Sequence, residues 1–235
     1  MRVLAIETAT PLASCAVVDG SGVLAEQTLR APMRHLEWLL PAVDDMLRSL
    51  ALRPHEIQGI AVSRGPGGFT GLRIGIATAA AWARSAGIPL LGVETLEALA
   101  MVAGGTGWVF AALDAHRGEV AAGLYRGGPD GLLVCTAGPI LAAPEVASRE
   151  AAAALDGAAA GPGDPVLVVG DGLVRHRDAL LAGLGGRGVV GGGHLHPRAA
   201  AVGMLGRARL LAGAQDDPHV LAPLYGRRPA VRTWQ

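Results

Sequence analysis

Short apolar runs, each bounded by residues that favour turns, recur along the first hundred residues of the chain. Runs of this length are typical of buried strands, which predicts strands over residues 3–6, 13–18, 23–29, 57–62 and 88–93. The second and third strands are separated by Asp19-Gly20-Ser21-Gly22, whose residues tolerate the positive φ angles of a tight turn. These two strands are therefore expected to form a hairpin.

Longer stretches with helical spacing lie between these strands. In the first stretch, apolar residues recur at intervals of three and four, at Leu36, Leu39, Leu40, Val43, Met46, Leu47 and Leu50. Pro41 has no amide hydrogen, so this helix is expected either to start late or to kink there. A second helix is expected from Thr70, which can act as its N-cap, to about Ser85, and a short third helix from about Thr95.

The same order of elements returns in the second half of the chain. It predicts strands over 108–113, 119–125, 132–141 and 166–169, a turn over 127–131, helices over 144–155, 173–184 and 197–214, and glycine-rich loops over 156–165 and 185–196. An acidic residue, Glu7 or Asp114, closes the first strand of each half. We therefore expect an α/β fold of two tandem ribonuclease-H-like units, the architecture of the actin, Hsp70 and sugar-kinase superfamily.

The repeat also predicts where the units begin and end. The first unit is expected to span residues 1–103 and to carry the first two helices. The second, smaller unit is expected to span 104–215. The C-terminal tail, 216–235, is expected to pack back on the first unit.

Composition narrows the classes of function. The 235 residues are 51% hydrophobic, enough for a sizeable core, and 20 basic residues balance 20 acidic ones. A protein that grips RNA through its own phosphate contacts carries a basic surplus, so any contact with a nucleic acid is expected to be indirect or to depend on a partner. No apolar run is long enough to span a membrane, and we expect a cytoplasmic protein whose two cysteines, Cys15 and Cys135, are buried free thiols.

The most informative segment spans residues 63–75, where a strand ends in a glycine-rich turn that opens a helix. Backbone amides in such a turn, together with those of the helix N-terminus, can hold a phosphate. A tight strand-to-helix turn that binds nothing has the same pattern. If the segment binds a nucleotide, the residues expected to contact it are Glu7, Thr8, Thr10, Gly65, Gly67 and Gly68.

Several segments resemble the TsaB (YeaZ) family, in the same order along the chain. Residues 65–75, GPGGFTGLRIG, are similar to the family's GPGSFTGLRIG signature, and residues 6–10, IETAT, to its opening IDTST. Similar correspondences are PLLGVETL at 89–96, DAHRGEV at 114–120 and PLY at 223–225. Glu7 and Gly68 replace the family's commoner Asp and Ser, and the second change removes a hydroxyl that could touch a phosphate.

The resemblance implies a non-catalytic scaffold and dimerisation subunit of the machinery that transfers a threonylcarbamoyl group to the adenosine beside the tRNA anticodon. It implies that the subunit binds and activates TsaD, the catalytic paralogue, and that a TsaE-like P-loop ATPase is a further partner. It also implies a homodimer when the subunit is alone. No cofactor is required, and weak ATP or ADP binding at or near the partner interface is compatible with the resemblance.

Two positions argue against catalysis by this chain. The paralogue holds a metal with a His-x-x-x-His pair on the helix after the fifth strand, because histidines four apart lie on one helix face. Aligning its Gly-Val with Gly92-Val93 puts Thr95 and Leu99 at those positions, and leucine has no lone pair to offer. We expect no catalytic residue and no metal site. The alternative is an enzyme in its own right, a glycoprotease-like metallopeptidase or a phosphotransferase using Glu7, Asp114 and residues 168–172.

The expected partner interface lies on the first two helices. Gly71, Gly75, Ala79 and Ala83 recur every four residues on the second helix, a spacing that lets a neighbouring helix approach closely. Packing against the chain's own sheet is the alternative explanation. The resemblance implies a four-helix bundle with the paralogue. The residues expected at the interface are Leu36, Leu39, Leu40, Val43, Gly71, Leu72, Gly75, Ala79, Trp82 and Ala83.

Overall fold

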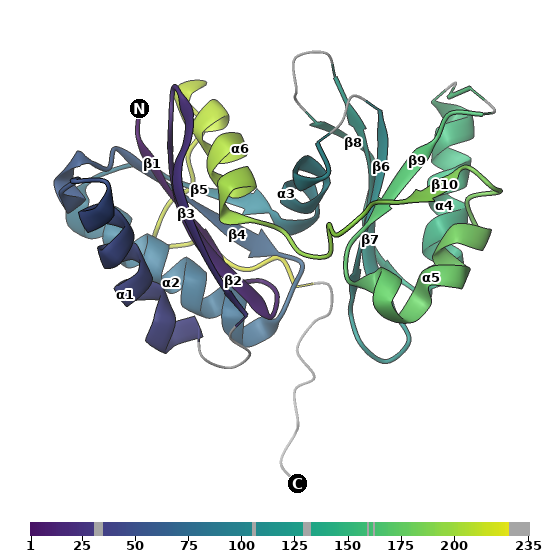
Figure 1. The fold of residues 1–235 in the computed structure, drawn as a ribbon, viewed down its shortest axis with the longest axis horizontal. Coiled ribbons are helices and arrows are strands. Elements are labelled where there is room, and N and C mark those ends of the chain that lie inside the picture. The colour runs from purple at the N-terminus through teal and green to yellow at the C-terminus, as the bar shows by residue number, and fades with distance from the viewer. Residues whose placement is uncertain (31–34, 105–106, 129–132, 159, 162, 226–235) are drawn as a thin grey trace, which may run out of the picture.

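Figure 1 shows the computed structural model of the chain, which describes residues 1–30, 35–104, 107–128, 133–158, 160–161 and 163–225. Two five-stranded sheets stand next to each other, each with helices on both faces. The first sheet has the order β3-β2-β1-β4-β5, and the second has the order β10-β9-β6-β7-β8. Read from its other edge, the second order repeats the first strand for strand. The predicted duplication of a ribonuclease-H-like unit is confirmed.

The first sheet consists of β1 (Val3–Glu7), β2 (Leu12–Asp19), β3 (Gly22–Arg30), β4 (Gly59–Gly65) and β5 (Leu90–Glu94). The first three strands form an antiparallel meander, with the predicted hairpin between β2 and β3. Strands β4 and β5 run parallel to β1. The carboxyl ends of these three strands therefore meet at one edge of the sheet, which is where α/β folds usually place a site.

The second sheet consists of β6 (Trp108–Asp114), β7 (Val120–Gly127), β8 (Leu133–Ala142), β9 (Val166–Val169) and β10 (Gly188–Val190). The pattern of apolar residues missed β10, because only three residues form it within a glycine-rich stretch that predicted a loop. The predicted turn at 127–131 lies largely outside the described residues.

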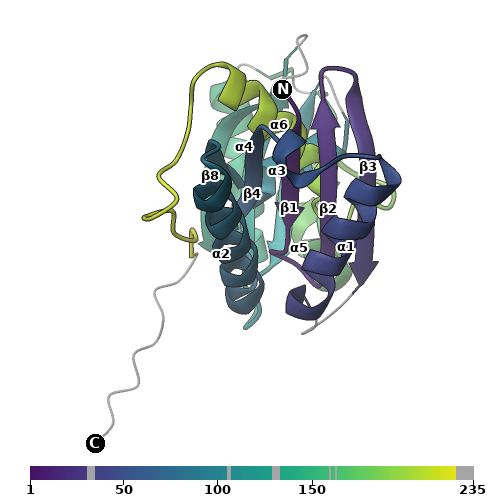
Figure 2. The same cartoon turned by 90° about the vertical axis from the view of Figure 1, so that its left-hand side faces the viewer.

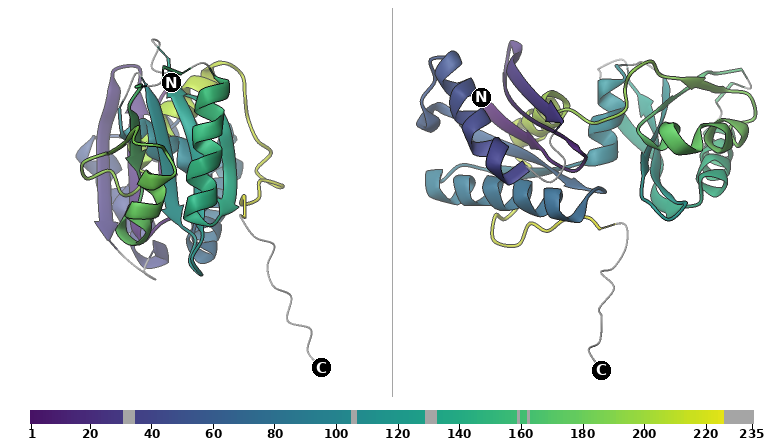
Figure 3. Two further views of the ribbon diagram at one scale, coloured as in Figure 1. Left: turned by 90° about the vertical axis from the view of Figure 1, so that its right-hand side faces the viewer. Right: turned by 60° about the horizontal axis from the view of Figure 1, so that its bottom comes forward.

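The helices of the described residues are α1 (His35–Ser49), α2 (Phe69–Ala86), α3 (Thr95–Val102), α4 (Pro144–Gly157), α5 (Gly172–Ala182) and α6 (Ala199–Leu211), and a single 3₁₀ turn spans Pro54–Glu56. Helices α1 and α2 lie side by side on the outer face of the first sheet (Figure 2). Helices α4 and α5 cover the outer face of the second sheet (Figure 3, left).

Each half sends its last helix to the middle of the molecule. Alternate residues of β1 face opposite sides of the first sheet, so Leu4 and Ile6 pack with α1 and α2. Val3 and Ala5 pack instead with α6. Helix α3 follows the first sheet in the sequence, yet Leu96 and other residues of α3 pack on the inner face of the second sheet. The two central helices also contact each other, which joins the two halves (Figure 1).

The position of α6 differs from the expected unit boundaries. The repeat assigns this helix to the unit 104–215, whereas its contacts are with β1, β2 and β4 of the first sheet. The approach is close because α6 carries glycine where it crosses β4: a Cβ on Gly206 would overlap the side chain of Ala61. The first structural unit therefore includes a helix from the end of the chain.

Two local predictions are wrong, and a third is narrowed. Helix α1 begins at His35 and continues through Pro41, which excludes the late start and leaves the kink at Pro41 as the prediction. The N-cap of α2 is Gly68, which has no side chain to form a capping hydrogen bond, and Thr70 lies inside the helix. Cys15 is buried as expected, but Cys135 is exposed, because it lies on the outermost strand of the second sheet.

The tail returns to the first sheet over its described part, Asp216–Tyr225 (Figure 3, right). The Asp216 amide donates to the Leu90 carbonyl oxygen at 2.8 Å, and the Asp216 carboxylate accepts from the Gly92 amide at 2.8 Å. The Leu224 amide donates to the Arg64 carbonyl oxygen at 2.6 Å. Residues 226–235 lie outside the described part. Within the described part, no helix is both long enough and apolar enough to cross a membrane.

Candidate functional site

The glycine-rich turn between β4 and α2 is held by the chain on two sides. The Gly68 amide donates to the Ala9 carbonyl oxygen at 2.7 Å, and Gly67 lies against the same residue. Gly65 has a φ of 115° and contacts the backbone of Leu224 in the tail. Glycine at positions 65 and 67 is thus required by contacts within the chain, whether or not the turn binds a phosphate, whereas a Cβ on Gly68 would make only an ordinary contact with Ala9.

Glu7 at the end of β1 is completely buried. Its carboxylate accepts hydrogen bonds from the Ser63 hydroxyl and, at 2.6 Å, from the Ala9 amide. Burial raises the pKa of Glu7 to about 7, although the hydrogen bonds from Ser63 and Ala9 act to lower it. This carboxylate holds the β1–β2 turn against β4, so its oxygens are turned inward, away from any ligand in solution.

The two threonines that were expected beside a nucleotide also have partners within the chain. The Thr8 hydroxyl donates to the Gly71 carbonyl oxygen at 2.8 Å, which ties the turn to the start of α2. The Thr10 hydroxyl donates to the Leu12 carbonyl oxygen at 3.2 Å. Both threonines are buried. The structure brings Glu7, Thr8, Thr10 and the glycine-rich turn together, but it uses their polar side chains to build the turn itself.

The stripe of small residues on α2 faces the chain's own sheet. A Cβ on Gly71 would overlap the Thr8 carbonyl oxygen, and one on Gly75 would overlap the Thr8 hydroxyl. Ala79 and Ala83 are buried in the core between α2 and the first sheet. The prediction that another chain approaches this stripe is therefore wrong, because β1 and its turn already fill the space that the small residues leave.

The larger residues expected at the interface divide between the core and the surface. Leu39, Val43 and Leu72 are buried within the chain and have no accessible surface to offer a partner. Leu36 and Leu40 are 66% and 53% exposed, and both lie on the outer side of α1. Part of the predicted apolar set is thus available for contact with another molecule.

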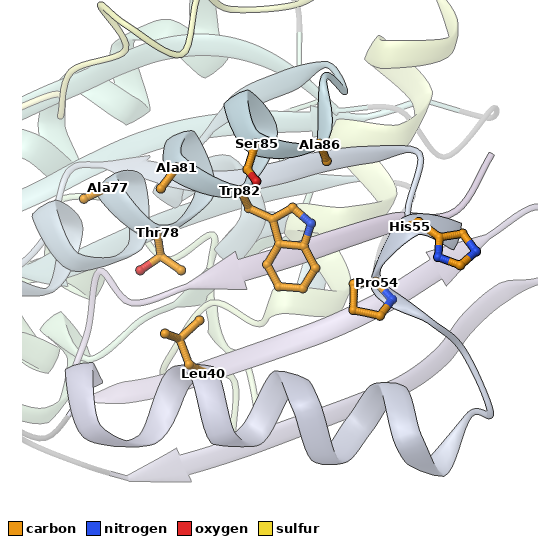
Figure 4. Close-up of a pocket in the computed structure, with 9 residues that line it drawn as sticks. All are labelled: Leu40, Pro54, His55, Ala77, Thr78, Ala81, Trp82, Ser85 and Ala86. Carbon is orange, nitrogen blue, oxygen red and sulfur yellow. The ribbon is translucent and has the colours of Figure 1, made fainter.

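A groove of about 700 Å³ runs between α1 and α2 on this outer side (Figure 4). Trp82 projects from α2 toward Leu40 of α1, and Pro54 and His55 close the end of the groove. Small residues of α2 line the groove at every fourth position, at Ala77, Ala81 and Ser85, beside Thr78, Trp82 and Ala86. This second stripe was missed, although its spacing is the same as that of the predicted one.

Aromatic residues lie near the N-terminal end of α2. Phe69 is 45% exposed and stacks on Tyr225 of the tail, with ring centroids 5.1 Å apart. The Arg73 guanidinium lies 4.3 Å from the centroid of the Phe69 ring, on a neighbouring turn of the helix. The described part of the tail therefore covers part of Phe69, the first residue of α2.

The positions expected to replace the paralogue's metal-binding histidines are both fully buried. The Thr95 hydroxyl accepts a hydrogen bond from the Gly65 amide at 3.1 Å. Leu99 packs in the core cluster that joins α3 to the second sheet. No group of three or more His, Cys, Asp or Glu side chains in the described residues is placed to hold a metal ion.

Asp114 at the end of β6 is the counterpart of Glu7 at the end of β1. The turn that follows Asp114 is more exposed than the turn that follows Glu7, and more charged side chains lie around it. The Asp114 amide donates to the Asp171 carboxylate at 2.9 Å, and the Asp114 carboxylate lies 3.4 Å from Nε of Arg175. His196, the last residue of the predicted glycine-rich loop over 185–196, is half-buried and lies 3.9 Å from the Asp171 carboxylate. Arg175 and Asp114 form an ion pair within the chain. Burial raises the pKa of Asp171 and lowers that of His196, so the contact between them is not a strong ion pair.

Comparison with known proteins identifies the family. The family model described as tRNA N6-adenosine threonylcarbamoyltransferase, TsaD, matches residues 16–137. The Bacillus subtilis protein named tRNA threonylcarbamoyladenosine biosynthesis protein TsaB is 32% identical over 234 residues, which cover 97% of this chain and 94% of that protein. The chain belongs to the TsaB (YeaZ) family. The resemblance stated from the sequence is confirmed.

Other relatives agree with TsaB membership. The Escherichia coli protein of the same name is 40% identical over 135 residues, so the match spans 56% of this chain and 58% of that relative. YeaZ from Pseudomonas aeruginosa superposes with a TM-score of 0.77 at 27% identity, over 95% of this chain and all of that one. A ROK hexokinase from Thermus thermophilus, at 13% identity and a TM-score of 0.52, is similar in fold alone. The predicted fold class, an α/β fold of two tandem units, is thereby confirmed.

Proposed function

We propose that this TsaB-family chain acts in tRNA threonylcarbamoyladenosine biosynthesis as a non-catalytic subunit that binds and activates a TsaD-type paralogue through α1 and α2. The observation that carries the proposal is the exposed apolar groove between these two helices. The names of the TsaB relatives support the pathway.

The chemistry of the groove favours a helical partner. Large apolar side chains that remain exposed on a helix pair are typical of a protein interface. The small residues Ala77 and Ala81 leave room for the ridges of an incoming helix, while Leu40 and Trp82 supply apolar area on either side. A paralogue of the same fold carries an equivalent helix pair, so the two pairs can form one bundle. A second copy of this chain can bind in the same way, which gives a homodimer that competes with the heterodimer.

Ala81→Arg tests the proposed interface. Ala81 is exposed in the middle of the groove, so a guanidinium there places an unpaired charge against apolar partner surface without disturbing the core. We expect the affinity for the TsaD-type paralogue to fall at least about a hundredfold, which corresponds to about 3 kcal/mol. Isothermal titration calorimetry measures the affinity, and sedimentation velocity measures the loss of the homodimer.

Ala153→Arg is the matched control, because Ala153 is exposed on α4 on the far side of the molecule. It should bind the paralogue as tightly as the unmodified chain does. An Ala81→Arg chain that is folded and binds the paralogue with unchanged affinity would contradict the proposal. Substitutions at Gly75 or Ala79 do not discriminate, because these residues are packed against the sheet and would disturb folding first.

The proposed absence of catalysis rests on Thr95 and Leu99, whose side chains are buried in place of metal ligands. We expect the purified chain to contain no stoichiometric metal and to transfer no threonylcarbamoyl group without the paralogue. Metal analysis and a transfer assay measure these two properties. A stoichiometric metal would favour the alternative, an enzyme in its own right.

The role of a partner subunit also implies contacts with a P-loop ATPase and with tRNA. A TsaE-type P-loop ATPase would join the heterodimer, and tRNA would be contacted mainly through the paralogue, since the chain has no net positive charge. We propose no required cofactor. Any ATP or ADP would bind weakly and near the interface, because the polar side chains of Glu7 and Thr8 are already engaged within the chain.

A further inference from the structure

A second pocket, of about 350 Å³, lies where the two halves meet, away from the groove between α1 and α2. Its charged and polar residues come from distant parts of the chain: Arg64 at the end of β4, Glu94 at the end of β5, Glu97 on α3, Tyr125 on β7 and Arg209 on α6. Nothing in the proposed role as a partner subunit uses this pocket. Its volume is at the small end of the range for ligand sites.

Two of its four charges neutralise each other. The Arg209 guanidinium forms an ion pair with the Glu97 carboxylate. Glu97 is buried and Arg209 is partly exposed, so this pair forms a fixed wall of the pocket. The charges left to meet a ligand are those of Arg64 and Glu94.

The Arg64 guanidinium has an unsatisfied donor within the described residues. Its Nε is buried and makes no hydrogen bond within the described residues, and such a donor is costly to leave unsatisfied. The side chain is held over Gly92, where a Cβ would lie 2.7 Å from Cδ of Arg64. Leu221 of the tail packs beside the same glycine. The guanidinium is therefore positioned by packing and still has donors to offer.

Glu94 is fixed on the other side of the pocket. The Tyr125 hydroxyl donates to Oε1 of Glu94 at 2.7 Å, which orients the carboxyl group. Burial raises the pKa of Glu94, although Tyr125, Arg209 and Arg64 act to lower it. Arg64 and Glu94 thus influence each other without forming an ion pair in the described structure. A cation placed beside Glu94 would offset the cost of burying its charge.

We propose that this pocket binds a small α-amino acid, with its carboxylate on Arg64 and its ammonium group on Glu94. A guanidinium binds a carboxylate through parallel hydrogen bonds, and a carboxylate accepts from an ammonium group. One positive and one negative group in a pocket whose other two charges pair with each other suit a zwitterion. A phosphate or another pure anion would meet the charge of Glu94 and find no partner for it.

Calorimetric titration of the full chain with glycine, L-alanine, L-serine and L-threonine tests the proposal. Acetate and ethylamine are the matched probes, because each carries only one of the two charged groups. We expect saturable binding of at least one of the four amino acids and much weaker binding of both half-ligands. The absence of saturable binding by all four at millimolar concentration would overturn the proposal. Acetate that binds as tightly as the amino acids would overturn it too.

Variants locate the site. Arg64→Gln and Glu94→Gln should each weaken amino-acid binding about tenfold, the usual effect of losing one charge-assisted hydrogen bond. Arg84→Gln and Glu150→Gln are the controls, since both residues are exposed on outer helices. Unchanged affinity in both pocket variants, with native circular dichroism spectra, would show that the amino acid binds elsewhere and would overturn the assignment. If a variant fails to fold, the comparison of ligands on the unmodified chain still decides.

Discussion

Replacing Gly71 with alanine is expected to lower the free energy of unfolding by about 3 kcal/mol. The added Cβ would overlap the carbonyl oxygen of Thr8, a backbone atom that cannot rotate away. The same turn is tied to α2 by the hydrogen bond from the Thr8 hydroxyl to the Gly71 carbonyl oxygen, so helix and turn would have to separate. Chemical denaturation monitored by circular dichroism measures the loss.

A loss of stability in Gly71→Ala would be opposite to the effect expected from helix propensity. On helix propensity alone, the replacement of glycine by alanine stabilises a helix by about 1 kcal/mol. Gly157→Ala at the end of α4 is the matched control, because no atom lies within 4 Å of the added Cβ. The control should leave the stability unchanged or slightly increased. If Gly71→Ala were equally neutral, α2 would not lie as close to the β1–β2 turn as the structure places it.

The second large effect concerns the pH dependence of stability. Burial raises the pKa of Glu7 to about 7 in the folded chain, above its ordinary value of 4.5. Between these two pH values the folded state binds more protons than the unfolded state, so stability falls as the pH rises. The difference between the two pKa values corresponds to about 3 kcal/mol, lost progressively between about pH 4.5 and pH 7.

Glu7→Gln removes the titrating group while keeping nearly the same shape. We expect the stability of the unmodified chain relative to this variant to fall from pH 5 to pH 8. Denaturant titrations of both proteins across that range measure the difference, which cancels contributions from other groups. Glu150→Gln, at an exposed site, should give a flat difference curve. A flat curve for Glu7→Gln would mean that the Glu7 carboxyl is not buried in the folded protein.

These two predictions concern the same small region for a physical reason. The β1–β2 turn lies between the glycine-rich turn and the first turn of α2, and Glu7 and Thr8 supply the hydrogen bonds that join them. In a duplicated fold of this kind, such a turn is a natural place for a phosphate. In this chain its side chains stabilise the scaffold that carries α1 and α2. A partner role through these helices is consistent with that use.

Much of the fold could be predicted from the sequence. Short strands and their hairpin are local features, since alternation, turn residues and apolar runs are read directly from neighbouring positions. The repeated order of elements then predicted two equivalent sheets. The strand β10 was missed because three residues among glycines carry no periodic signal. Helix α6 was assigned to the wrong unit because its position along the chain does not determine which sheet it covers.

At the candidate site, too, some features could be predicted from the sequence and others depended on tertiary contacts. The GPGGFTGLRIG segment and the replacements at Thr95 and Leu99 could be read from the sequence, and the family that they indicated is confirmed. The polar contacts could not be read from it. Glu7 meets Ser63 and Arg64 meets the pocket only after β1, β4 and β5 have come together, and no local pattern encodes such contacts between distant residues.

The sequence by itself determined the order of elements, the duplication, the family and the fact that α2 carries small residues at every fourth position. Only the tertiary structure decided which side of α2 is free. Gly71, Gly75, Ala79 and Ala83 lie against the sheet, while Ala77, Ala81 and Ser85 line the groove. Both stripes have the same period, so spacing alone cannot distinguish them. The choice is made by packing, because the helix turns its closest-fitting side to the strands and leaves the other side exposed.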